Sequence, residues 1–161
     1  MTTRKRDKFI KGISINPSRL ENSFVFLYPW YGSFSIVKYK NTNIKFLVFK
    51  RNTNLYSLFP LKGKPVCKVR GFQKKQSRII RTYKTVVTVV NRREVKKGYE
   101  VHHIDHNPFN NYPENLVVVS SNQHRFLHKI FEQAIADFYN TGRQDKLNFY
   151  KQVVKKMQAY A

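Results

Sequence analysis

The positive charge and the histidines of this 161-residue chain lie in different parts of its sequence, and this division constrains how the chain folds. Residues 1–98 contain 24 Lys and Arg against three acidic residues, whereas residues 99–161 contain seven against six. All five histidines lie between His102 and His128. A net charge of +22 favours a polyanionic partner, either nucleic acid or an anionic membrane surface. The first part is therefore expected to bind a polyanion, and the second to use imidazole chemistry.

Three features exclude other classes of protein. The longest apolar run, Phe24 to Trp30, has seven residues and contains Pro29, far short of the roughly 20 residues that span a bilayer. The basic N-terminus leads into no apolar segment, so it does not resemble a secretory signal. A single cysteine, Cys67, excludes an intramolecular disulfide and a cysteine-rich zinc site. We therefore expect an intracellular protein whose partner is nucleic acid and not a membrane.

Hydrophobic patterning predicts an α+β fold with a basic, β-rich N-terminal part. Short runs rich in Phe, Tyr, Val and Ile are separated by Gly, Asn and Thr, which is typical of antiparallel strands. These runs are Phe34–Tyr39, Lys45–Lys50, Leu55–Phe59 and Val66–Arg70. The expected regions are a basic arm (1–11), a basic β-rich region that binds DNA (12–76), a region that carries the histidines (77–140) and a C-terminal amphipathic helix (141–161).

The segment Ser77–Arg93 is ambiguous between strand and helix. Its many Thr and Val residues suit a strand, but its apolar residues recur at helical spacing. We favour a helix, because its polar residues then share the outer face. These residues are Arg78, Arg81, Thr82, Lys84, Thr85 and Thr88.

A strand, a loop, a second strand and two helices are predicted after this segment. The strands are expected at Tyr99–Ile104 and Leu116–Val119. Ser120 and Gln123 form a capping-box pattern that opens a helix. The expected helices run to about Asn140, with a stop at Gly142, and over about Asp145–Tyr160.

Two pairs of histidines fall on this predicted unit. His124 and His128 are four residues apart on the helix, so both rings can point at one atom. The alternative is that each is a half-buried surface histidine. His102 and His103 end the first strand, which the second strand brings back against the helix. Strict alternation sends adjacent strand residues to opposite faces, so the residues alone leave open which ring is a ligand and which a base.

The stretch VHHIDHNPFNNYPENLVVVSSNQHRFLHK resembles the motif of the HNH endonucleases, a group of ββα-metal nucleases. Its spacing also agrees, with gaps of 12, 9 and 4 residues from the second histidine onward. The matching positions are His102, His103, Asn115, His124 and His128.

The resemblance implies a ββα-metal hairpin-plus-helix unit over roughly residues 99–130. It assigns His103 as the general base and Asn115 as the residue that holds its ring through a hydrogen bond. It makes His102, His124 and His128 the ligands of one divalent ion, which is Zn, Mn, Ni or Mg, and it implies no organic cofactor. The expected helix before the motif, followed by a Gly and then the strand, is similar to homing-type and phage members of the family, but less specifically.

These expectations point to a metal-dependent endonuclease that hydrolyses DNA. The alternatives are a non-catalytic nucleic-acid-binding protein stabilised by zinc, and an RNA-binding protein in which the motif is a coincidence. Asp105 is expected to order the loop or to accept a hydrogen bond from a ligand histidine, and His106 to be a surface residue. Candidate phosphate contacts are Lys74, Lys75, Arg78, Arg81, Lys84, Arg92, Arg93, Lys96, Lys97 and Arg125.

Overall fold

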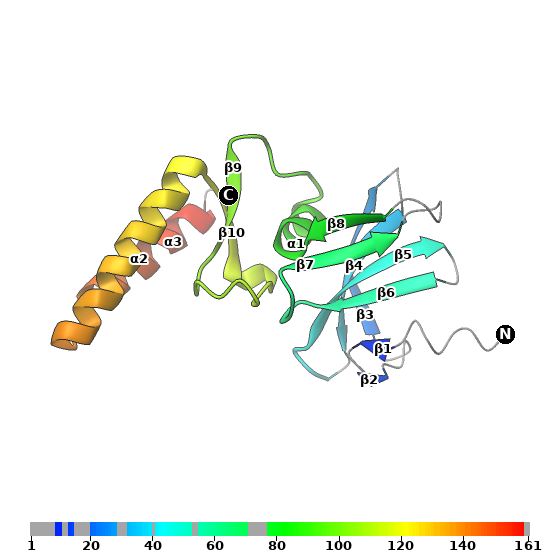
Figure 1. Ribbon diagram of the computed structural model, residues 1–161, viewed down its shortest axis with the longest axis horizontal. Helices are drawn as coiled ribbons and strands as arrows, with labels where there is room; N and C mark the ends of the chain where they lie inside the picture. Colours follow the sequence, from blue (N-terminus) through cyan, green and yellow to red (C-terminus); the bar gives the residue numbers. More distant parts are fainter. Residues whose placement is uncertain are drawn as a thin grey trace.

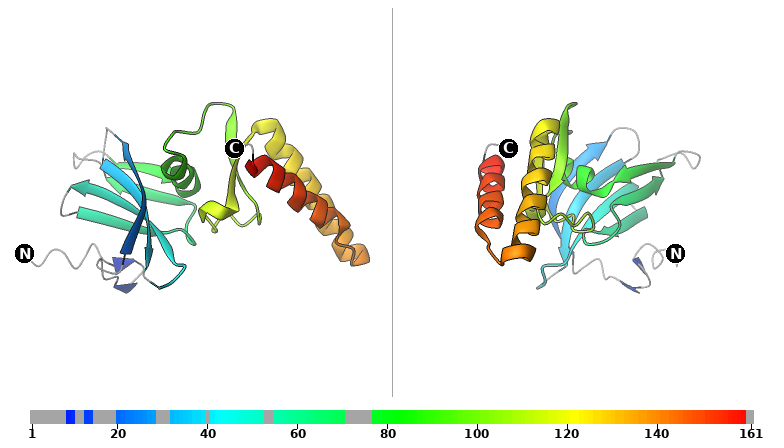
Figure 2. Two further views of the ribbon diagram at one scale, coloured as in Figure 1. Left: turned by 180° about the vertical axis from the view of Figure 1, so that it is seen from behind. Right: turned by 60° about the vertical axis from the view of Figure 1, so that its left-hand side comes forward.

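The computed structural model of the protein describes residues 9–10, 13–14, 20–28, 32–39, 41–52, 55–70 and 77–159. In this part of the chain a four-stranded sheet lies at one end and a pair of helices at the other, with a β-hairpin between them (Figures 1 and 2). The mixture of helices and small sheets agrees with the predicted α+β class. Most of the predicted basic arm lies outside the described residues.

The N-terminal half is built from strands, and the C-terminal half from one hairpin and three α-helices. The strands of the first half are β1 (Phe9–Ile10), β2 (Ile13–Ser14), β3 (Leu20–Tyr28), β4 (Gly32–Tyr39), β5 (Lys45–Asn52), β6 (Leu55–Pro60), β7 (Val66–Arg70) and β8 (Ser77–Arg81). The later elements are α1 (Thr82–Asn91), β9 (Tyr99–His103), the 3₁₀-helix η3 (Pro113–Asn115), β10 (Leu116–Ser120), α2 (Ser121–Thr141) and α3 (Asp145–Ala159).

Strands β3 to β6 form an antiparallel meander in sequence order, as the punctuated runs predict. Alternation along β4 and β5 places Phe34, Ile36, Leu47 and Phe49 in one cluster, where they pack with the valines of α1. Leu116 of β10 belongs to the same cluster. One hydrophobic core therefore joins the sheet, α1 and the hairpin.

The prediction of a helix over the whole of Ser77–Arg93 is wrong at its first residues. Ser77–Arg81 is strand β8, which pairs antiparallel with β7, so that Cys67 lies opposite Ile80. The helix begins only at Thr82. Pairing with β7 is a long-range interaction, and it overrides the helical spacing of the apolar residues because it also satisfies the strand preference of Ile79 and Ile80.

The outer face predicted for this segment is also wrong for its three threonines. Thr82, Thr85 and Thr88 are 0%, 6% and 2% exposed. Their hydroxyl groups donate to the backbone carbonyls of Lys64, Arg81 and Lys84. A threonine whose hydroxyl is satisfied in this way presents a methyl group to the core, so it packs there almost as valine does.

The hairpin β9–β10 carries the histidine pair at its end. The strands pair antiparallel, with His102 opposite Val117 and His103 opposite Leu116. The amide of Ile104 donates to the carbonyl of Asn115, which extends the pairing by one step. The strand β9 therefore ends where the two histidines lie, and the loop of residues 104–112 begins there.

Helices α2 and α3 pack against the outer side of this hairpin. Ser120 and Gln123 form the predicted capping box, and Gly142 ends α2 in a left-handed conformation with φ 71°. The shared core of the hairpin and the two helices consists of Val117, Val119, Leu127, Tyr150 and Val154. No helix among the described residues is long and apolar enough to cross a membrane.

The turn after β6 is bonded to the loop of the hairpin. The carbonyl of Leu61 accepts from the amide of Asn111 at 2.8 Å, and the amide of Gly63 donates to the carbonyl of Phe109 at 2.9 Å. Lys62 forms an isolated antiparallel bridge with Asn110 between these two bonds. The N-terminal half therefore supports the middle of the loop that follows the histidine pair.

Candidate functional site

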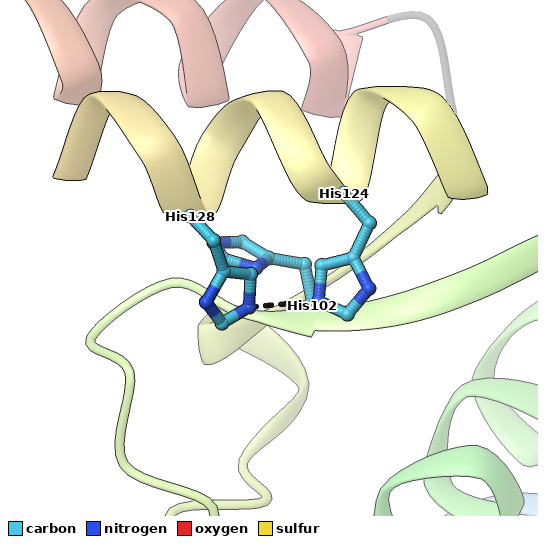
Figure 3. Close-up of side chains that lie close together, drawn as sticks. All are labelled: His102, His124 and His128. Carbon is cyan, nitrogen blue, oxygen red and sulfur yellow. Dashed lines mark hydrogen bonds between the residues drawn. The ribbon is translucent and has the colours of Figure 1, made fainter. Parts of the chain in front are cut away.

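Three histidine side chains from two elements converge on one point. His102 comes from β9, and His124 and His128 come from successive turns at the start of α2 (Figure 3). One ligand nitrogen from each ring lies within 4.8 Å of the others, and the Nε2 atoms of His124 and His128 are 3.0 Å apart. Two nitrogens bound to one ion lie about 3 Å apart, because each lies about 2.0–2.1 Å from it. The structure thus brings together the three residues that the sequence predicts as ligands.

His102 is fully buried and has one ring nitrogen without a partner. Its Nε2 lies 2.7 Å from the hydroxyl of Tyr150, whereas its Nδ1 makes no hydrogen bond with any residue that the structure describes. Burial, reinforced by the charges of His106, His124, His128 and His103, lowers the pKa of His102 to about 3. The ring is therefore neutral at pH 7, and a cation would satisfy the buried lone pair.

A carboxylate holds the first helix histidine from outside the cluster. The Nδ1 of His124 donates to the carboxylate of Glu100 on β9 at 2.5 Å, which leaves Nε2 directed at His128. The hydrogen bond from His124 lowers the pKa of Glu100. Histidines that bind metals commonly donate their other N–H to a carboxylate in this way, which fixes the ring and makes it a stronger ligand. Burial lowers the pKa of His128, the most exposed of the three.

His103 lies in a different environment from its neighbour. Its Nε2 is 2.8 Å from the Oδ1 of Asn111, and its ring meets the ring of Tyr83 edge-on at 5.1 Å. Because an amide oxygen only accepts, Nε2 carries the proton and the lone pair of the neutral ring lies on Nδ1. In this arrangement Nδ1 is the ring nitrogen that remains available to accept a proton.

The predicted hydrogen bond between Asn115 and His103 is wrong, because Asn111 occupies that position. The side chain of Asn115 instead closes the loop: its Nδ2 donates to Asp105 at 2.8 Å and to the carbonyl of Asn110 at 2.9 Å. Its Oδ1 accepts from the amide of Asp105. Asn115 is 8% exposed and lies in η3, whose backbone directs the amide into the loop and away from His103.

Two further residues of the cluster were missed or misplaced by sequence reasoning. His106, predicted at the surface, stacks on Phe131 at 3.7 Å and lies 4.6 Å from the ring of His128. Its backbone adopts φ 59°, which turns the chain back toward α2. Tyr150 reaches the cluster from α3, and no motif in the sequence signals it. Asp105 orders the loop, since its carboxylate accepts from Asn107, Asn110 and Asn115.

Most of the described basic candidates are exposed and lie around α1 and the segment that follows it. Lys74 and Lys75 lie outside the described residues, and the side chain of Arg78 is likewise not described. Arg125 donates to Asn122 on the same helix. The remaining candidates are all exposed; these are Arg81, Lys84, Arg92, Arg93, Lys96 and Lys97.

We expect acid to destabilise the metal-free protein through its buried histidines. The pKa of His102 in the folded chain is about 3 and that of His106 about 4, both below the ordinary value of 6.5. Below pH 6.5 the unfolded chain therefore binds protons that the folded chain does not, and stability falls as the pH decreases toward these values. From pH 7 to pH 5, His102 alone is expected to lower the free energy of unfolding by on the order of 1–2 kcal/mol.

Urea unfolding at both pH values with a chelator present measures this change, and the variant His102→Gln is the comparison. The variant lacks the buried imidazole, so its stability should fall by a smaller amount over the same interval. An equal fall in the free energy of unfolding of the two proteins would contradict the role of the buried His102 ring in the loss of stability.

Comparison with known families identifies part of the site. Residues 93–126 match the model of a family described as HNH endonuclease, which confirms the resemblance seen in the sequence. The matched segment includes His102, His103, Asn115 and His124 and stops before His128. No curated protein and no solved structure matches the chain. The segment that carries the histidine pair is thus similar to a family of nucleases.

Proposed function

We propose that the protein is a metal-dependent endonuclease that hydrolyses phosphodiester bonds of DNA. The observation that carries the proposal is that the two adjacent histidines at the end of β9 lie in different environments. His102 joins the cluster with His124 and His128, while His103 is bonded to an amide oxygen and belongs to no such cluster. A purely structural metal site accounts for the first arrangement but gives the second no role.

In this proposal the residues divide the work of hydrolysis. His103 accepts the proton of the attacking water at Nδ1. Its Nε2 donates a hydrogen bond to Asn111, so that the proton of the neutral ring is on Nε2 and Nδ1 is free to accept one. His102, His124 and His128 would hold one divalent ion, which when bound supplies positive charge for the phosphate and the leaving oxygen. Three imidazoles favour Zn, Mn, Ni or Co over Mg as the ion.

The excess positive charge supports DNA as the polyanion. Exposed Arg92, Arg93, Lys96 and Lys97 follow α1 and lead directly into β9. A surface cavity of about 640 Å³ lies beside them; it is lined by Arg93, Lys96 and Lys156 among others, and by none of the histidines. Basic residues beside the cavity would hold the phosphate backbone, and such contacts weaken steeply with salt.

Cleavage of supercoiled plasmid and of a folded RNA, each with a panel of single divalent metals, tests the proposal. We expect nicked or linear plasmid with at least one metal, no product with a chelator, and weaker DNA binding as salt is raised. Absence of plasmid cleavage with every metal, under conditions where the protein binds the plasmid, would contradict it. Cleavage of RNA alone would replace DNA by RNA as the substrate.

A further inference from the structure

The hydroxyl of Tyr150 is the meeting point of three groups around the histidine cluster. It lies 2.7 Å from the Nε2 of His102, 3.2 Å from the Nε2 of His106 and 2.7 Å from the carbonyl oxygen of Ile104. Tyr150 belongs to α3, far outside the segment 93–126 that matches the HNH family. Its side chain is 2% exposed and packs in the core shared by the hairpin and the two helices.

The hydrogen bonds of the Tyr150 hydroxyl indicate which ring nitrogen of His102 carries a proton. A tyrosine hydroxyl has one proton, and here it is donated to the carbonyl of Ile104, which can only accept. Both histidine nitrogens that contact the hydroxyl must then donate to its lone pairs. His102 is therefore protonated on Nε2, and its lone pair lies on Nδ1, the buried atom that has no partner among the described residues.

We propose that Tyr150 is a positioning residue of the metal centre: it holds the His102 ring in the Nε2–H tautomer, so that Nδ1 is the atom that binds the ion. This inference rests on the metal centre of the proposed function. Two contacts make the arrangement rigid. The tyrosine is fixed in the core by Leu127 and Val154, and His106, its second donor, is held by stacking on Phe131.

The hydroxyl of Tyr150 is buried, and burial favours its neutral form. Burial, together with the charge of Asp105, raises the pKa of Tyr150 well above its ordinary value. A neutral hydroxyl has one donor and two acceptor positions, which match its three contacts. The tyrosine thus acts on His102 by orientation.

The test is the metal affinity of Tyr150→Phe, which removes only the oxygen. Because partners of this kind contribute about 10–100-fold to metal affinity, we expect the dissociation constant for Zn²⁺ or Co²⁺ to rise by that factor. Competition with a chromophoric chelator measures it, and the absorption spectrum of bound Co²⁺ reports a change in ligand geometry. Tyr139→Phe is the matched control, since Tyr139 is 83% exposed on α2, and its affinity should equal that of the wild type.

Two outcomes separate this inference from the proposed function. If the wild-type protein binds no divalent metal, both the metal centre and the role of Tyr150 are overturned. If the wild type binds metal and Tyr150→Phe binds it equally well with an unchanged Co²⁺ spectrum, the role of Tyr150 alone is overturned.

A direct measurement covers the case in which Tyr150→Phe fails to fold. Long-range ¹H–¹⁵N NMR spectra of the metal-free wild type report which nitrogen of His102 carries the proton. The proton is expected on Nε2, and a proton on Nδ1 would overturn the inference.

Discussion

Replacing His103 by alanine is expected to abolish DNA cleavage while DNA binding and metal binding remain. Removal of a general base typically costs about 10²–10⁴-fold in rate, because the attacking water then loses its proton acceptor. The ring of His103 contacts Asn111 and Tyr83 and lies outside the histidine cluster found among the described residues, so its loss leaves the three clustered histidines in place. Single-turnover cleavage of a plasmid, with binding measured in parallel, gives the result. Cleavage by His103→Ala at a rate close to that of the wild type would refute the assignment of the base.

The variant Asn111→Ala tests the orientation of this base separately. It retains the imidazole and removes only the oxygen that accepts from Nε2. Misplacement of a reacting group by about 1 Å can cost 10²-fold, so we expect a loss of roughly 10–100-fold, smaller than that of His103→Ala. Asn115→Ala should instead lower stability, because it releases three hydrogen bonds of the loop.

Replacing His124 by alanine is expected to cost both metal binding and activity. Loss of a ligand removes a bond to the ion itself, so the loss of affinity should exceed the 10–100-fold that outer partners contribute. Cleavage at a metal concentration that saturates the wild type should fall by at least about 100-fold, since charge at the phosphate is lost. Titration calorimetry and plasmid cleavage over a range of metal concentrations measure the two losses. Unchanged metal affinity in His124→Ala would show that the cluster is not the site.

Removal of the metal by a chelator distinguishes a nuclease from a protein held together by zinc. The core around the cluster contains Val117, Val119, Leu127, Tyr150 and Val154, which pack through apolar contacts. We therefore expect the metal-free protein to keep its far-UV circular dichroism and to lose cleavage. Unfolding on chelation would favour the alternative of a structural zinc.

The convergence of the three histidines could be predicted because their signal is local. The spacing of His124 and His128 places both on one helix face, and the hairpin pattern returns His102 to that helix. The partner of His103 could not be predicted in the same way. Asn110, Asn111 and Asn115 are all loop asparagines in the sequence, and only the bonds between the loop and the turn after β6 decide that Asn111 faces the ring.

The errors elsewhere have a similar origin. The strand β8 depends on pairing with β7. The burial of Thr82, Thr85 and Thr88 depends on backbone carbonyl groups that accept hydrogen bonds from their hydroxyl groups. Neither is visible in a pattern of polar and apolar letters. Tyr150 lies in the predicted C-terminal amphipathic helix, and its ring packs in the core. Its oxygen, however, meets His102 because α3 folds back across α2 onto the hairpin.

The bonds between the turn after β6 and the hairpin loop have a consequence for how the chain can be divided. Leu61, Lys62 and Gly63 belong to the strand-rich half, yet they hold the backbone from Phe109 to Asn111. A fragment that begins at Tyr99 would keep the three clustered imidazoles and lose these backbone bonds. Excision of the minimal motif would therefore leave the histidine cluster without the support that keeps Asn111 beside the ring of His103.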